Sequence, residues 1–187
     1  MSHPRSTMRP RLPQPVQCVS VLMPASNRSA TCTPGGGGVP VDIGELCSRE
    51  VHIVTPAEPL ADAIGEMQRR HVGALVVVAE EADVIRPIGV VTDRDAIRAQ
   101  VVQRKGLGGL TVADAMTAHP LTLRESCGLA EAIGQMNARG VRRAPVVSES
   151  GDLVGVVSFD DLLPAVAQQL NALARLIGDQ ARREGGG

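Results

Sequence analysis

The sequence predicts an α/β fold built from two tandem β-α-β-β-α repeats in a pseudo-twofold pair, with a disordered N-terminal leader and a C-terminal helix. Three observations predict it: an internal repeat, matching hydrophobic periodicities in both copies, and a chain of 187 residues that is 43% hydrophobic. This length suits one domain of ordinary size or two small repeats with a real core. We expect the leader over residues 1–40, the repeats over 41–105 and 106–170, and a helical extension with a tail over 171–187.

Composition argues against several classes of function. No run approaches the roughly 18–20 apolar residues that cross a bilayer. The formal net charge is −1, which gives no general basic field for nucleic acid. With no Trp, no Tyr and one Phe, the chain lacks aromatic platforms for stacking bases. The four cysteines and four histidines are scattered, so we expect reduced thiols in a cytoplasmic protein, without a metal site or a disulfide scaffold.

The N-terminal leader differs from the rest of the chain. Residues 1–41 contain four arginines and no acid, are rich in Pro and Ser, and include four consecutive glycines at 35–38. Such a segment buries too little apolar surface to offset its ordering entropy, so we expect disorder. The basic start before the apolar run 16–25 leaves a signal or transit peptide open. A nucleic-acid-associated regulator that uses the leader's arginines also stays open.

The internal repeat decides the fold. An offset of 69 residues aligns three pairs of blocks: 43–48 with 112–117, 60–67 with 129–136, and 72–78 with 141–147. A fourth pair, 89–95 with 155–161, aligns at an offset of 66, so the first repeat carries three extra residues between its apolar runs. Insertions are cheapest at a hairpin tip, which we expect over residues 80–87.

Both repeats show the same order of elements. Apolar residues spaced i, i+4, i+7 predict an amphipathic helix, and β-branched runs predict buried strands. In the first repeat we expect strands near 51–54, 75–78 and 88–91, a helix from Leu60, and a closing helix from Thr92. In the second we expect strands near 121–123, 145–147 and 153–157, a helix from Leu129, and a closing helix from Ser158.

The last helix is expected to run beyond the repeat, to about Arg183. Pro164 removes one hydrogen bond near its start and should bend it. An apolar stripe follows at heptad-like spacing: Val166, Leu170, Leu173 and Ile177. Since an exposed apolar stripe is costly, we expect it to pack against the repeats or against a twofold-related copy, and the partner we expect is a second copy in a homodimer.

The chain resembles the CBS-domain (Bateman module) family over about residues 41–170. The resemblance is carried by Met116-Thr117 after Val112-Ala-Asp-Ala, by the two Leu-x-x-Ala helix starts, and by two Gly-h-h-[Thr/Ser]-x-x-Asp turns, where h is apolar. No single block is specific, but their duplication in one order is. The resemblance implies two repeats that meet through their sheets with a cleft on each side. It also implies a regulatory module that binds AMP, ADP, ATP or a related adenosine compound and signals to an unknown protein in trans.

The two turns suggest how a nucleotide could be held. Each strand ends where a helix begins, and a helix N-terminus beside a hydroxyl suits an anion. Thr92 and Ser158 could donate to phosphate oxygens, while Asp95 and Asp161 could accept from ribose hydroxyls. The same Thr-x-x-Asp and Ser-x-x-Asp pairs could instead be capping boxes. The protein would then be a structural dimerisation module without a ligand.

The resemblance implies that each site is completed by strands of the other repeat. Asp95 and Thr92 would face the second-repeat residues Thr122, Leu123, Val141, Arg143 and Ala144. Asp161 and Ser158 would face the first-repeat residues Ile53, Val54, Val72, Gly73 and Ala74. The strand residues other than Arg143 would hold adenine.

Arg94 and Arg143 would bind phosphate at the first site, although Arg143 could also belong to a solvated strand edge. The partner strand of Asp161 has no nearby arginine. We therefore expect the Asp95 site to be the better phosphate binder, and the Asp161 site to be empty or to prefer a less charged adenosine compound. No catalytic residue is expected, because the repeats place no nucleophile–base pair or carboxylate dyad.

Overall fold

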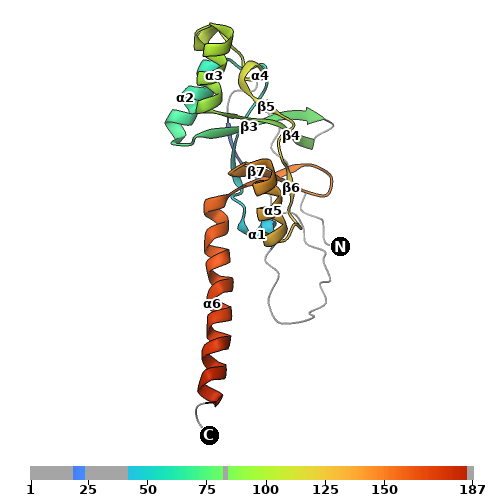
Figure 1. Cartoon of the computed structure of the whole chain (residues 1–187). Coiled ribbons are helices and arrows are strands. Elements are labelled where there is room, and N and C mark those ends of the chain that lie inside the picture. The colour runs from blue at the N-terminus through green and yellow to red at the C-terminus, as the bar shows by residue number, and fades with distance from the viewer. Residues whose placement is uncertain (1–18, 24–41, 82–83, 185–187) are drawn as a thin grey trace, which may run out of the picture.

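The computed structural model describes residues 19–23, 42–81 and 84–184 (Figure 1). The first repeat consists of β2 (Glu50–Val54), α2 (Leu60–Arg70), β3 (Ala74–Glu81), β4 (Val84–Thr92) and α3 (Asp93–Gln103). The second consists of β6 (Leu123–Arg124), α5 (Leu129–Arg139), β7 (Arg143–Val147), β8 (Leu153–Ser158) and α6 (Phe159–Glu184). The expected β-α-β-β-α order is therefore confirmed in both repeats.

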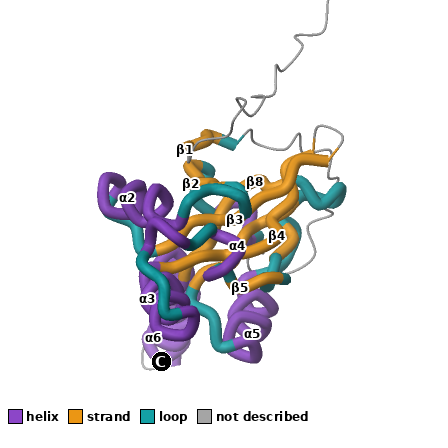
Figure 2. The backbone as a smooth tube through the Cα atoms, turned by 90° about the horizontal axis from the view of Figure 1, so that it is seen from above, coloured by secondary structure: helices purple, strands orange, loops and turns teal. Residues whose placement is uncertain are grey.

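The sheets of the two repeats have the same pairing. In the first, β2 runs parallel to β3, and β3 is antiparallel to β4. In the second, β6 runs parallel to β7, and β7 is antiparallel to β8. Both antiparallel pairs shift register at the matching place, after Val77 and after Val146. Figure 1 shows the strands between α2 and α3 on one side and α5 on the other, and Figure 2 shows the same elements from above.

The two sheets meet through an aliphatic core. Buried Ile53 and Val76 of the first repeat cluster with Leu153 of the second, and Val156 packs against them. Each repeat has a further core between its sheet and its helices, which includes Met67 in the first and Met136 in the second. The expected meeting of the repeats through their sheets is thus confirmed.

Each repeat lends a short segment to the other. α1 (Ile43–Leu46) comes at the start of the first repeat but packs in the core of the second, where the Ile43 amide donates to the Cys127 carbonyl at 2.9 Å. α4 (Val112–Ala115) comes at the start of the second repeat but packs in the core of the first, and the Val112 amide donates to the Glu58 carbonyl at 2.9 Å. After η1 (Leu107–Gly109) and α4, β5 (Thr117–Ala118) adds a strand beside β4. This exchange ties the repeats together through the backbone.

Part of the leader is ordered, contrary to expectation. β1 (Val19–Leu22) pairs antiparallel with β2, and Val21 and Met23 are buried in the core between the sheets. The pairing covers an edge strand that would otherwise expose its backbone groups. The prediction of disorder is therefore wrong for residues 19–23, and the rest of the leader lies outside the described residues.

α6 leaves the module as a long helix (Figure 1). Pro164 lies inside it, near its start. Val166 packs against the second-repeat core, whereas Leu170 and Leu173 are 62% and 58% exposed. Leu170 and Leu173 therefore do not pack against the repeats, so the stripe as a whole is not buried by them. The Ile177 side chain lies outside the described part.

No helix in the described part of the chain is long and apolar enough to cross a bilayer. The cytoplasmic location expected from the sequence stays a prediction.

Candidate functional site

The two strand-to-helix corners are closed by their own side chains. At the first, the Thr92 hydroxyl donates to Asp95 Oδ2 at 2.6 Å, and the Thr92 amide donates to the same oxygen at 3.1 Å. At the second, the Ser158 hydroxyl and amide both donate to Asp161 Oδ2 at 2.7 Å. Both motifs therefore cap their helices, as the structural alternative expects. Capping occupies only one oxygen of each carboxylate, so it does not exclude ligand binding.

The second carboxylate oxygen distinguishes the corners. Asp95 Oδ1 lies 3.6 Å from Nη1 of Arg98. Asp161 Oδ1 has no hydrogen-bond or ion-pair partner among the described residues. An ionised carboxylate can accept several hydrogen bonds. Asp161 therefore retains more capacity than Asp95 to accept hydrogen bonds from a ligand.

A cavity of about 290 Å³ lies beside the Asp161 corner. Its lining comes from both repeats: Ser158 and Asp161 at the corner, Arg143–Pro145 and Val156 from the second repeat, and Ser48, Glu50–His52, His71, Val72, Ala74–Val76 and Val90 from the first-repeat side. Ligand sites in proteins start near about 300 Å³, so this volume suits one small ligand such as a mononucleotide. A ligand here would touch both halves of the pair.

The structure brings only some of the first-repeat residues predicted for this site to the cavity. Val72 and Ala74 line it, and Gly73 lies between them. Ile53 and Val54 do not line it, because their side chains are fully buried in two different cores. Three other residues of β2, Glu50–His52, line the cavity instead.

Arg143 lies at a different site from the one expected. The resemblance assigned Arg143 and Ala144 to the Asp95 site, but both line the cavity at Asp161. The cause is the register of β7 and β8, which pairs Arg143 with Ser158 in the same repeat. The expectation that the Asp161 site lacks an arginine considered only the strands of the other repeat, whereas Arg143 belongs to the same repeat as Asp161.

The other residues expected around Asp95, and Asp95 itself, do not line this cavity. Thr92, Arg94, Asp95, Thr122, Leu123 and Val141 are absent from its lining. Leu123 is buried in the second-repeat core, which Val141 packs against, while Arg94 and Thr122 are exposed. The Asp95 corner has the motif, but neither Thr92 nor Asp95 lines the cavity at Asp161.

Two histidines at the cavity were not predicted. His52 comes from β2, and His71 ends α2 in the left-handed region at φ 55°. Their counterparts in the second repeat are Leu121 and Gly140. Comparison of the two repeats at these positions is the only sequence signal that could have found them.

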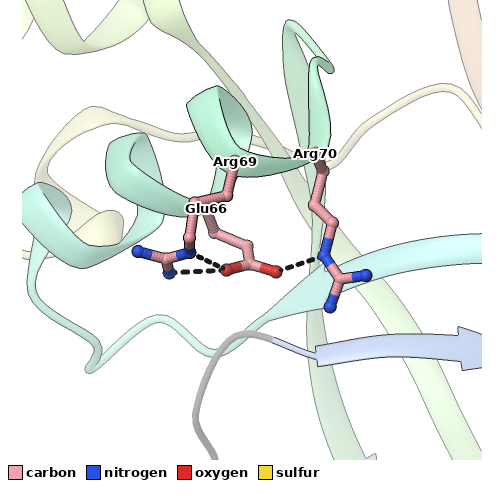
Figure 3. A network of polar contacts seen from close by, with 3 residues as sticks. All are labelled: Glu66, Arg69 and Arg70. Atoms are coloured by element: carbon pink, nitrogen blue, oxygen red, sulfur yellow. Dashed lines mark hydrogen bonds and ion pairs between the residues drawn. The ribbon is translucent and has the colours of Figure 1, made fainter.

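The end of α2 that carries His71 is held by a polar network (Figure 3). Buried Glu66 accepts from Nε of Arg70 at 2.7 Å and from Nε of Arg69 at 3.0 Å. Hydrogen bonds from Arg70 and then Arg69 hold the pKa of Glu66 below its usual range. The Val72 amide also donates to the Met67 carbonyl at 3.0 Å, which closes the helix end.

The described thiols lack the properties of nucleophiles. Cys47 and Cys127 are buried. Burial raises the pKa of Cys47, and it raises the pKa of Cys127 to about 11. Both thiols are therefore protonated at neutral pH. Over the described ranges, no three His, Cys, Asp or Glu side chains form a group that could hold a metal ion.

Comparisons with known proteins agree with this architecture. The CBS domain family model matches residues 43–102 and 112–168. The protein MK0525 of Methanopyrus kandleri is 32% identical over 123 residues, which cover 66% of this chain and 61% of that protein.

Two solved structures share the fold. A putative signal-transduction protein with CBS domains from Burkholderia ambifaria is 33% identical with a TM-score of 0.54, over 62% of this chain and 82% of that one. CBSX2 from Arabidopsis thaliana, solved in complex with AMP, is 27% identical with a TM-score of 0.57, over 68% of this chain and 96% of that one. The duplicated architecture and the two family matches together show that the chain belongs to the CBS domain family, as a pair of CBS repeats.

Proposed function

We propose that the protein is a regulatory CBS pair that binds an adenosine nucleotide in the cavity at Asp161 and signals to a partner protein. The observation that carries the proposal is the convergence of Ser158, Asp161 and Arg143 on one cavity that both repeats line. CBSX2, which has the same fold, is solved with AMP bound. The AMP-bound structure of CBSX2 supports an adenosine ligand for this protein as well.

Each side chain has a role that follows from its chemistry. Asp161 accepts from the ribose hydroxyls through its open Oδ1, while Oδ2 keeps its bonds to Ser158. The guanidinium of Arg143, which forms no ion pair with a described residue, binds the phosphate together with the N-terminus of α6. Val72 and Val156 supply apolar surface for the purine ring.

Binding can become a signal because the ligand bridges the repeats. A ligand that contacts both walls of the cavity stabilises the arrangement of the two repeats in which both walls are close enough to touch it. A ligand shifts a conformational equilibrium only by its difference in affinity for the two states. A partner protein that recognises one arrangement would therefore respond to the ligand concentration.

Isothermal titration of the whole chain with AMP, ATP and S-adenosylmethionine tests the proposal. We expect saturable binding of at least one compound by protein whose circular dichroism shows it folded. If no compound binds, the structural alternative holds: the corners serve as helix caps, so Asp161→Ala lowers the melting temperature while no adenosine compound raises it.

We also propose that the protein forms a homodimer through α6. Leu170 and Leu173 are exposed on a helix that extends from the module, and they share its apolar stripe with Val166. Pairing two such helices would bury both stripes.

Analytical ultracentrifugation tests the dimer. The wild-type chain should sediment as a dimer at micromolar concentration, and Leu170→Lys should sediment as a monomer. Gln168→Lys is the matched control, because Gln168 is exposed on the opposite side of the helix, and it should remain dimeric. A monomeric wild type, or Leu170→Lys that stays dimeric, contradicts this interface.

A further inference from the structure

The cavity at Asp161 has two imidazoles that the nucleotide-binding motif does not include. His52 and His71 both come from the first repeat, whereas Ser158 and Asp161 belong to the second. The second repeat has Leu121 and Gly140 at the corresponding positions. The two halves therefore repeat the motif but not the imidazoles.

His52 has one ring nitrogen that the protein does not satisfy. Nδ1 is buried and has no hydrogen-bond partner among the described residues. A buried N–H without an acceptor is more costly than a buried lone pair, so the proton of the neutral ring belongs on Nε2. Nε2 is not among the buried unpartnered atoms and makes no hydrogen bond to a described residue. It is therefore the nitrogen that can donate to a ligand in the cavity.

His71 occupies a backbone conformation that suits glycine better. It ends α2 at φ 55° and ψ 38°, and Gly140 ends α5 at φ 63° and ψ 29°. A side chain in this region is disfavoured, and residues kept in such conformations cluster at functional sites. Since His71 is exposed and lines the cavity, its ring can contribute to binding without a role in the core.

Arg143 lies close to the segment that carries His71. Its Nη1 is 3.8 Å from the position that a Cβ on Gly73 would occupy, and Gly73 is two residues beyond His71. The guanidinium thus reaches from the second repeat toward the first. Arginine has only hydrogen-bond donors, and each neutral imidazole offers one donor. Acceptor-rich phosphate is the part of a nucleotide that fits such a set of groups.

We propose that His52 and His71, together with Arg143, form a phosphate-selecting end of the Asp161 cavity. This inference rests on the proposed nucleotide-binding function and names the residues that determine its ligand class. It reverses the sequence-based expectation that this site prefers a less charged adenosine compound. The carboxylates of Asp161 and Glu50 also line the cavity, so selection depends on directed donors and not on net positive charge.

The test compares AMP with adenosine on the whole chain, with affinities from calorimetry and from NMR titration where binding is weak. The variants are His52→Leu and His71→Gly, which install the residues of the second repeat. Each should weaken AMP binding about tenfold, as expected for loss of one hydrogen bond to a charged group. Adenosine, which has no phosphate, should bind each variant as it binds the wild type.

His119→Gly is the matched control. His119 is also exposed and has a positive φ of 52°, but it does not line the cavity. Its replacement should leave the affinity for AMP unchanged. Neither cavity variant should lower the melting temperature, because His52→Leu removes an unsatisfied nitrogen and His71→Gly relieves a disfavoured conformation.

The outcomes separate this inference from the function on which it rests. If the wild type binds AMP and both variants bind it equally well, the imidazoles have no role and only this inference is wrong. If the variants lose AMP and adenosine by the same factor, the imidazoles contact the nucleoside and phosphate selection is wrong. If the wild type binds neither compound, the proposed function itself is rejected.

Discussion

Glu66 on α2 forms ion pairs with two arginines of the same helix, Arg69 and Arg70. Its side chain is 7% exposed, while those of Arg69 and Arg70 are 68% and 47% exposed. The lowered pKa means that the carboxylate contributes stability above its unfolded-state pKa of about 4.3. That contribution is lost as the pH falls through the lower pKa of the folded state.

Replacing Glu66 tests this contribution. Glu66→Gln introduces the residue of the second repeat, Gln135, and keeps the side-chain shape. At pH 7 we expect the free energy of unfolding to fall by about 0.5–1 kcal/mol, a modest value because both arginines are largely exposed. The difference from wild type should shrink as the pH falls below the unfolded-state pKa of about 4.3, and it should vanish once the pH is below the lower pKa of the folded state.

Urea unfolding at pH 7 and at pH 3 measures this difference. Glu131→Gln on α5 is the control, because Glu131 is exposed and its carboxylate accepts a hydrogen bond from Nε2 of Gln135 at 3.0 Å, with no arginine partner among the described residues. An equal loss for Glu66→Gln at both pH values would show that packing, and not the ionised carboxylate, is responsible.

At the same scale, the sequence predicts a shared site for residues that lie close together in the chain. Ser158 and Asp161 are three positions apart, so their joint placement at a helix start follows from local geometry. His52 and His71 come from separate elements, and no local pattern predicts that they share a cavity. The resemblance places Arg143 at the other site, and the register of β7 and β8, which no local pattern predicts, pairs it with Ser158.

At the scale of elements, the exchange of α1 and α4 depends on two glycines. A Cβ on Gly155 would lie 2.6 Å from Cys47 Sγ and 2.8 Å from the Ser48 carbonyl oxygen. A Cβ on Gly89, its counterpart, would lie 2.8 Å from Sδ of Met116. The methionine can move aside, whereas the Ser48 backbone is paired with Val156.

We therefore expect Gly155→Ala to be the more harmful substitution. It should lower the free energy of unfolding by about 1–3 kcal/mol, the usual range for overpacking, and Gly89→Ala should cost less. Gly134→Ala is the control: it lies on α5 with open space around its Cβ position and should stabilise the protein by about 0.5–1 kcal/mol. Chemical denaturation measures all three, and equal costs at Gly155 and Gly89 would contradict this account of the exchange.

Most helices and strands can be predicted, because each shows a hydrophobic periodicity within its own stretch of sequence. The helices at 60–70 and 129–139 begin where their apolar spacing begins. β1 was missed because the composition of the whole leader argues for disorder. Its order depends on β2, about 30 residues away in sequence, whose open edge it covers.

At the scale of the whole molecule, two nearly equivalent halves produce an unequal pair of sites. The repeat predicts the pseudo-twofold fold and places a corner of the same type in each half. The cavity at Asp161 is lined by side chains from both halves, so the repeat alone cannot predict it. The sequence favoured Asp95, whereas the cavity, the open carboxylate oxygen and Arg143 favour Asp161.

The most direct test of this asymmetry compares the affinity of wild type, Asp161→Ala and Asp95→Ala for AMP by isothermal titration. The two variants are matched, because each removes a carboxylate that caps a helix. Loss of a charge-assisted bond of about 1.5–3 kcal/mol predicts that Asp161→Ala weakens AMP binding about 10- to 100-fold. Asp95→Ala should bind AMP within about twofold of the wild type. The opposite order, or an equal loss in both variants, would contradict the assignment of the nucleotide to the cavity at Asp161.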